Sequence, residues 1–111
     1  MKKDAKVFIG HILESIGFIE EYTKGKTEDD FLESVPLQDM IVRRIEIIGE
    51  AAKNIPRNIR EKYSGIPWKQ IAGMRDVLIH EYFGIDLRLT WQTATRNILA
   101  LKRNLLKMKL D

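Results

Sequence analysis

SGIPWKQIAGMRDVLIHEYFGID, residues 64–86, is the stretch around which the rest of the chain is organised. Pro67 suits the first turn of a helix, and the residues that follow predict a helix over residues 68–82, ended by Gly84. Its apolar residues fall on more than one face, with Ile71, Met74 and Leu78 on one side and Ile79 and Phe83 elsewhere. A helix with several apolar faces must be buried on several sides. In so small a domain, this predicts a subunit interface.

Amphipathic helices are predicted on both sides of this stretch. Residues 4–24 and 36–54 have apolar side chains at three- and four-residue spacing, and residues 87–110 repeat them in heptad-like steps. The expected core residues are Ile9, Ile12, Leu13, Ile16 and Ile19; Leu37, Ile41, Ile45, Ile48, Ala52 and Ile55; and Leu87, Trp91, Ala94, Ile98, Leu101, Leu105 and Met108. With a short helix at 57–63, the pattern predicts an all-α, up-and-down bundle of about four main helices that forms a dimer.

The composition is that of one soluble helical domain over residues 1–111. Of the 111 residues, 44% are apolar and 32% are charged, and the net charge of +3 permits a nucleic-acid partner. Zero cysteines exclude disulfides, thiol catalysis and thiolate metal sites. No apolar run approaches the roughly 20 residues of a membrane span, and no cleavage site follows the N-terminal VFIGHIL. We therefore expect no membrane association, no signal peptide and a cytoplasmic location.

Several polar residues outside the central stretch have structural interpretations. Thr27, followed by acidic residues at 28–30, predicts a capped short helix, and a metal site is disfavoured because no histidine is near in sequence. His11 belongs to a second apolar stripe with Val7, Phe18 and Tyr22, which predicts an interfacial or partly buried histidine. Arg44 points among apolar residues, either snorkelling or directed towards a polar site.

Arg75, His80 and Tyr82 are the candidate chemical group. A histidine transfers protons near neutral pH, and an arginine binds a phosphate by two hydrogen bonds. Together they suit metal-independent RNA cleavage, in which a 2′-hydroxyl attacks the adjacent phosphodiester. The structural alternative is a histidine at a helix end beside a salt-bridged arginine.

In an unbroken helix, Arg75 and His80 would point about 140° apart, whereas Arg75 and Tyr82 would be nearly aligned. Two arrangements bring the arginine and the histidine together. Either the helix is distorted near its end, or two copies of the motif meet across a dimer axis. The surplus of apolar surface favours the second arrangement.

IPWKQIAGMRDVLIHEYFGID, with IEIIGEAAKNIP upstream, resembles the HepT-like branch of the HEPN-domain proteins. The resemblance runs from about Asp39 into the last helix and carries the Arg-x4-His-x-Tyr pattern. It implies a dimeric helical bundle that acts as an endoribonuclease without metal or other cofactor. It also implies a toxin of a HepT/MntA toxin–antitoxin pair, whose MntA-like nucleotidyltransferase antitoxin transfers AMP to the motif tyrosine.

Carried over by this resemblance, Arg75 and His80 are the catalytic pair and Tyr82 is the AMP site. Asp76 departs from the polar residue, commonly asparagine, that the family has after the arginine, and its charge either orients Arg75 or repels a phosphate. Arg43 and Glu46 are expected to support the site. On spacing alone, Arg43, Glu46 and Glu50 could equally pair with one another on a solvated helix face.

Two other functions compete with a toxin ribonuclease that binds RNA. The chain could be a non-catalytic regulatory subunit of a nucleotidyltransferase, because such domains are reused in that way. General RNA binding through the basic last helix is the weaker alternative, since no aromatic stacking platform accompanies its lysines and arginines.

Overall fold

The computed structural model describes residues 4–80 and 84–110, so that Tyr82 and the side chain of His80 lie outside the described part. The helices are α1 (Ala5–Thr23), α2 (Glu28–Leu32), α3 (Val35–Lys53), α4 (Arg57–Lys62), α5 (Trp68–Ala72), α6 (Met74–Leu78), α7 (Leu87–Gln92), the π-helical turn η1 (Thr93–Asn97) and α8 (Ile98–Leu106). Strands β1 (Ile79–His80) and β2 (Gly84–Ile85) form one short antiparallel pair. The prediction of a mainly helical bundle is confirmed.

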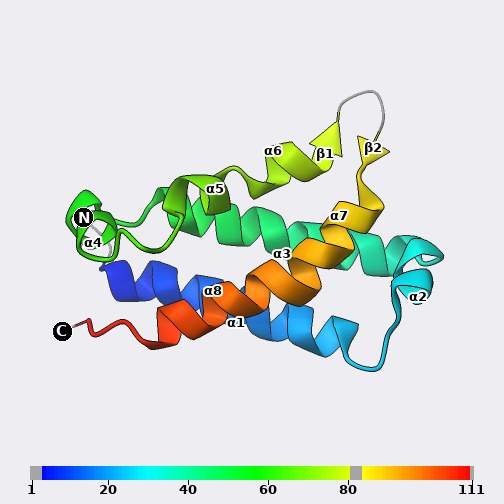
Figure 1. Cartoon of the computed structure of the whole chain (residues 1–111), viewed down its shortest axis with the longest axis horizontal. Coiled ribbons are helices and arrows are strands. Elements are labelled where there is room, and N and C mark those ends of the chain that lie inside the picture. Colours follow the sequence, from blue (N-terminus) through cyan, green and yellow to red (C-terminus); the bar gives the residue numbers. More distant parts are fainter. Residues whose placement is uncertain (1–3, 81–83, 111) are drawn as a thin grey trace.

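The two longest helices, α1 and α3, form the centre of the bundle. They lie side by side, with the α5–α6 segment against α3 and α8 against α1 (Figure 1). Isoleucines at the predicted spacing fill the space between them, because the three-and-four repeat places them on one face of each helix. Those that are at most 1% exposed are Ile12, Ile16, Ile19, Ile41, Ile45 and Ile48. The predicted core faces of these two helices are confirmed, except that Leu13 is half-buried.

The connection from α1 to α3 is closed by side-chain caps. Thr27 and Asp30 form the predicted capping box at the start of α2, with the backbone N–H of Thr27 donating to the Asp30 carboxylate at 2.9 Å. The buried amide of Gln38 donates to the carbonyls of Phe31 and Leu32 at 3.0 and 3.2 Å, which satisfies acceptors at the end of α2. Of the acidic residues at 28–30, Asp30 therefore has a structural role in the cap.

The helix predicted over residues 68–82 is wrong. It is interrupted at Gly73, and the second piece, α6, ends at Leu78, after which Ile79 adopts an extended backbone. Glycine is a poor helix former, and the residues from Val77 onward are rich in β-branched and aromatic types that favour strands. Gly84 therefore does not end a helix; it lies in β2 with φ of 76°, a conformation that glycine adopts freely.

The helix predicted over residues 87–110 also differs from the structure. Of its predicted core positions, Ala94, Ile98, Leu101 and Leu105 are buried as expected, whereas Leu87, Trp91 and Met108 are only half-buried. In addition, α8 ends at Leu106 and the π-helical turn η1 interrupts the regular helix. The hydroxyls of three threonines donate to carbonyls four residues earlier, at 2.7 to 2.8 Å; they are Thr90, Thr93 and Thr95. Such bonds compete with the helical ladder and distort it.

The second stripe of α1 is only partly covered. His11 is exposed in the single chain, so of the two predicted alternatives partial burial is wrong, and a place in a subunit interface stays a prediction. The Arg44 guanidinium lies over the Phe18 ring, 4.4 Å from its centroid, and Phe18 stacks on Tyr22. Arg44 therefore covers apolar surface and does not face a polar site. In the described ranges, no helix is long and apolar enough to cross a membrane.

The capping box predicts a pH-dependent contribution to stability. The hydrogen bond from the Thr27 backbone, followed by that from the Thr27 side chain, lowers the pKa of Asp30 below its ordinary value of 3.8. Because the folded pKa is below the unfolded one, the stabilisation is complete above about pH 5 and is lost as the pH falls through the folded pKa. We expect Asp30→Asn to lower the urea midpoint at pH 7, and the difference from wild type to shrink towards pH 2.

Asp29→Asn is the matched control, because it removes the same charge from the same helical turn while leaving the capping box intact. A pH-dependent difference of equal size in both variants would show that the helix dipole, and not the cap, is responsible.

Candidate functional site

Arg75 lies on α6 and is held by a carboxylate from α3. Its Nε donates a hydrogen bond to Oε2 of Glu46 at 2.7 Å, across 29 positions in sequence. The Arg75 side chain is 50% exposed and that of Glu46 is 30% exposed. The arginine of the motif is thus anchored on one edge and open to solvent over the rest.

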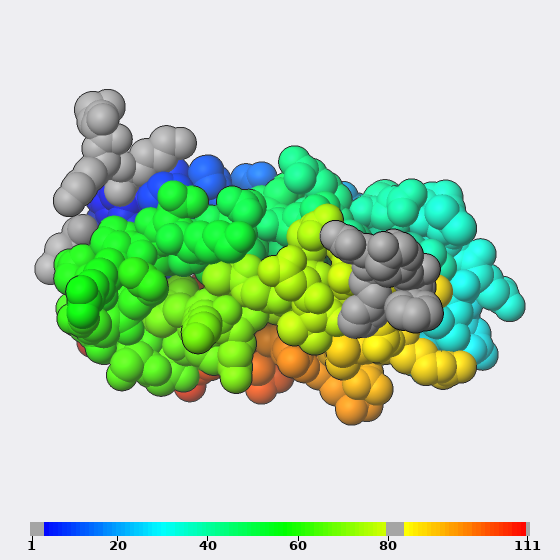
Figure 2. All heavy atoms as spheres, turned by 90° about the horizontal axis from the view of Figure 1, so that it is seen from above, coloured from blue at the N-terminus to red at the C-terminus, as the bar shows by residue number. Residues whose placement is uncertain are grey.

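An open pocket of about 300 Å³ surrounds this pair between α3 and the α5–α6 segment. Its charged lining residues are three cations and three carboxylates: Arg43, Lys53, Arg75, Glu46, Glu50 and Asp76. Seen from above in Figure 2, the α5–α6 segment runs along this face between α3 on one side and α7 and η1 on the other. Because the positive and negative charges balance, net charge alone would not attract an anion to this pocket. Binding of an anion depends on which charged side chains point towards it.

The predicted pairing of Arg43 with Glu46 and Glu50 is not what the described residues show. Glu46 bonds Arg75, and Glu50 pairs with Lys53 at 3.3 Å. Arg43 lies in the same pocket without an ion pair to any described residue. The structure therefore brings four of the predicted site residues together and assigns Glu46 a tertiary partner.

Asp76, the residue after Arg75, contacts the arginine only loosely. Its Oδ1 lies 3.7 Å from Nη1 of Arg75, too long for a hydrogen bond, and its side chain is 79% exposed. Solvent screens so exposed a charge effectively. Of the two carboxylates beside Arg75, Glu46 is therefore the one that orients it.

Gly49 sets the distance between α3 and α5, and sequence reasoning missed it, as it missed Lys53. A β-carbon at Gly49 would lie 3.2 Å from the carbonyl oxygen of Ala72 and 3.4 Å from that of Ile71. The available signal was a glycine inside a strongly helical segment, which often marks a close backbone approach.

His80 follows Arg75 by five residues but is not on its helix. After Leu78 the chain enters the β1–β2 pair, in which His80 is opposite Gly84 and Ile79 is opposite Ile85. The backbone N–H of Asp86 donates to the Leu78 carbonyl at 2.7 Å and closes the base of this pair. The helix therefore ends between the two residues, and the separation of about 140° expected in an unbroken helix does not apply. The meeting of two motif copies across a dimer axis, the arrangement favoured from the sequence, stays a prediction.

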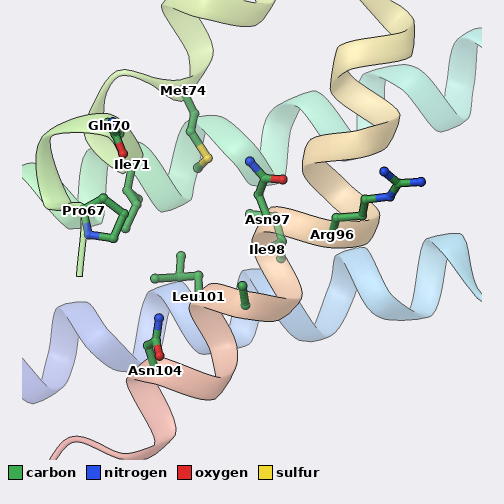
Figure 3. Close-up of a pocket in the computed structure, with 10 residues that line it drawn as sticks. Pro67, Gln70, Ile71, Met74, Arg96, Asn97, Ile98, Leu101 and Asn104 are labelled. Carbon is green, nitrogen blue, oxygen red and sulfur yellow. The ribbon is translucent and has the colours of Figure 1, made fainter. Parts of the chain in front are cut away.

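A second, larger cavity of about 450 Å³ lies on the other side of the α5–α6 segment, facing η1 and α8 (Figure 3). Met74 points into it, whereas the next two residues, Arg75 and Asp76, line the first pocket. Its floor is apolar and its rim is polar; the lining residues are Pro67, Gln70, Ile71, Met74, Arg96, Asn97, Ile98, Ala100, Leu101 and Asn104. Of the predicted site residues that the structure describes with their side chains, Arg43, Glu46, Arg75 and Asp76 do not line this cavity.

The other polar candidates have ordinary contacts. The centroid of the His11 ring lies 6.3 Å from that of the Phe8 ring, in an edge-to-face arrangement. Lys102 of the basic last helix pairs with Glu20 at 2.8 Å and joins α8 to α1. No three histidine, aspartate or glutamate side chains within residues 4–80 and 84–110 converge as metal ligands would.

In chemical terms, the first pocket presents an arginine whose orientation is set through Nε. A guanidinium carries five N–H donors, so that one bond at Nε leaves the two terminal nitrogens as donors for a bidentate anion. The arrangement suits recognition of a phosphate or carboxylate group that approaches from solvent.

Comparisons with known proteins agree with the motif. Residues 12–108 match the family described as "Ribonuclease HepT-like". The chain is 46% identical to a "Putative RNase" of Caldanaerobacter subterraneus subsp. tengcongensis over 91% of its length and 90% of that protein. It is 42% identical to a "Probable ribonuclease HepT" of Thermococcus cleftensis over 98% and 99% of the two lengths.

A longer relative shows that a similar sequence also occurs within a larger protein. The chain is 60% identical, over 97% of its length, to a Methanocaldococcus jannaschii protein named "Gamma-glutamylcyclotransferase and putative RNase". It spans only 49% of that relative. No solved structure matches the chain.

Replacing Gly49 tests the close approach that positions the pocket. Gly17→Ala, at a helical glycine with open space around it, is expected to raise the free energy of unfolding by about 1 kcal/mol through helix propensity. Gly49→Ala gains the same propensity but must push the α5 backbone away, at a cost of about 1–3 kcal/mol. We expect it to be no more stable than wild type in urea unfolding. Equal stabilisation by both substitutions would contradict the close contact.

Proposed function

The chain belongs to the HepT-like ribonuclease family, and from this premise we propose that it is an endoribonuclease that cleaves RNA without a metal ion. The observation that carries the proposal is the Arg75 guanidinium, fixed on its Nε edge at an open pocket and followed five residues later by His80. The matching of the family over residues 12–108, with the Arg-x4-His-x-Tyr pattern intact, supports the same activity.

The proposed reaction uses the 2′-hydroxyl of the RNA itself as the nucleophile. His80 accepts its proton while the 2′-oxygen attacks phosphorus, and the bond from phosphorus to the 5′-oxygen breaks as that oxygen takes up a proton. The products are a 2′,3′-cyclic phosphate and a 5′-hydroxyl, so that no water is consumed in this step. Arg75 stabilises the charge that accumulates on the non-bridging phosphate oxygens.

A homodimer is part of the proposal. Apolar side chains remain exposed on α1, α3 and α6: Val7 is 40% exposed, Met40 41% and Val77 59%. Burial in a subunit interface would remove such surface from water. Pairing of two chains would also supply two copies of the Arg-His motif, as the family resemblance implies.

We further propose that the protein is the toxin of a pair whose antitoxin is an MntA-like nucleotidyltransferase. AMP transfer to Tyr82 would place a phosphate two residues beyond His80, in the segment that follows Arg75. The added charge and bulk would compete with RNA for the arginine and silence the nuclease. Tyr82 lies outside the described residues, so this part rests on the sequence motif and the family.

Cleavage of RNA in EDTA by wild type and His80→Ala tests the activity. We expect the variant to lose at least about 100-fold in rate, the usual contribution of a general acid–base group, with nearly unchanged thermal unfolding. His11→Ala, which removes the other histidine, serves as the control and should cleave like wild type. A large loss of stability in His80→Ala would instead indicate a structural histidine.

The same assay includes protein treated with an MntA-like nucleotidyltransferase and ATP, beside Tyr82→Phe treated identically. Modification should stop cleavage by wild type and leave the Tyr82→Phe variant active. If unmodified wild type leaves several RNA pools uncut, the non-catalytic regulatory subunit becomes the better interpretation.

The dimer is tested by sedimentation equilibrium over a range of concentrations. We expect a mass twice the 13.0 kDa of the chain. Val77→Glu, which introduces a charge at the exposed apolar end of α6, should shift the equilibrium towards monomer if that surface is at the interface. A wild type that sediments only as a monomer would contradict a composite site.

A further inference from the structure

We propose that Glu46 is the positioning residue for Arg75, holding its guanidinium by Nε so that the two terminal nitrogens face the scissile phosphate. This inference rests on the proposed function, since it assigns a role in the same reaction. It does not make Glu46 a catalytic residue, because the carboxylate acts only through the arginine.

The contact has the geometry that such a role requires. The bond from Nε of Arg75 to Oε2 of Glu46 is 2.7 Å, within the short range of charge-assisted hydrogen bonds. It fixes the plane of the guanidinium from the edge nearest the chain. The terminal nitrogens, which carry four of the five N–H donors, are the pair whose geometry matches two oxygens of a phosphate.

Glu46 is the firmer of the two partners. It lies within α3, a 19-residue helix, between Ile45 and Ile48, which are 1% and 0% exposed. Arg75 lies on α6, a helix of five residues bounded by Gly73 and the β1 strand. A short helix between two breaks is weakly held by its own hydrogen bonds. A bond to the central helix therefore supplies orientation that α6 alone lacks.

The other carboxylates of the pocket do not duplicate this contact. Glu50 bonds Lys53 at 3.3 Å, and Asp76 lies 3.7 Å from Nη1 of Arg75 with 79% of its side chain exposed. Glu46 is only 30% exposed, so its interaction with Arg75 is less screened by water. Exposed ion pairs add little to folding stability, which makes orientation of the arginine the main consequence of this pair.

Loss of this bond should slow the chemical step and leave the fold intact. Misplacing a catalytic group by about 1 Å costs on the order of 100-fold in rate. For Glu46→Ala we therefore expect kcat to fall about 10- to 100-fold, with KM changed by less than about threefold. Glu46→Gln keeps an oxygen that accepts from Nε and should recover a large part of the lost rate.

Glu61 provides the matched control. It accepts a hydrogen bond from Nε of Arg57 at 2.9 Å on α4, which is the same type of pair outside the pocket. Glu61→Ala should leave kcat and KM at wild-type values, and all variants should unfold within a few degrees of wild type. If Glu46 were only structural, its variants would unfold at a lower temperature, and Glu46→Ala and Glu46→Gln would have the same kcat.

The outcomes separate this inference from the function on which it rests. No cleavage by wild type overturns the proposed function, and the role of Glu46 with it. If wild type cleaves RNA and Glu46→Ala has an unchanged or higher kcat, only the positioning role is overturned. A higher kcat would indicate that Glu46 competes with the phosphate for Arg75. A fall in kcat with partial recovery in Glu46→Gln supports the positioning role.

A measurement independent of activity examines the bond itself. In ¹⁵N-correlated spectra, the Nε–H of Arg75, assigned by its loss in Arg75→Lys, should exchange slowly with water in wild type and faster in Glu46→Ala. The Nε–H of Arg57 should be unaffected in the same spectrum, because Glu61 remains. An Arg75 signal with equal exchange in both proteins would overturn the inference.

Discussion

The packing of α1 against α3 is the constraint on which the rest of the molecule depends. A row of isoleucines in each helix is almost fully withdrawn from water, and each buried side chain of this size contributes about 1.5–3 kcal/mol. This interface makes α3 the firm element to which the weaker parts attach. The α5–α6 segment, with two five-residue helices, lies directly against it. The position of Arg75 is therefore set by contacts with α3 more than by its own helix.

The charged side chains of α3 that line the pocket lie on its outer face, because its other face is buried in the core. Glu46 and Glu50 alternate with buried isoleucines and small residues around the helix, so one element both closes the core and lines the pocket. Gly49 lets the α5 backbone approach closely at the same level. Because the ion pairs here are half exposed, they add little stability. Little stability therefore depends on them, in keeping with the positioning role that we propose for Glu46.

The break of the motif helix changes how the site is understood. A continuous helix would have directed Arg75 and His80 to different sides and would have required a second copy to bring them together. The change from helix to strand after Leu78 removes that restriction, since Arg75 lies on α6 and His80 lies on β1. Pairing of two chains is then no longer required by helix geometry, and it stays a prediction.

The sequence alone determined the class of fold, the core and the family. Periodic isoleucines identified both long helices and their buried faces, and the Thr27 cap was readable because capping is local chemistry. The Arg-x4-His-x-Tyr motif and its surrounding sequence identified Arg75 and His80 as candidate catalytic residues. The sequence offered local reasons for the break at Gly73 and for the π-helical turn at residues 93–97, but the structure was needed to locate them. The bond from Arg75 to Glu46 was decided only by the tertiary structure. Spacing within a helix predicted partners for Glu46 three or four residues away, but its partner comes from another element 29 residues along the chain. Local patterns report which residues share a face, whereas which faces meet depends on how the whole core packs.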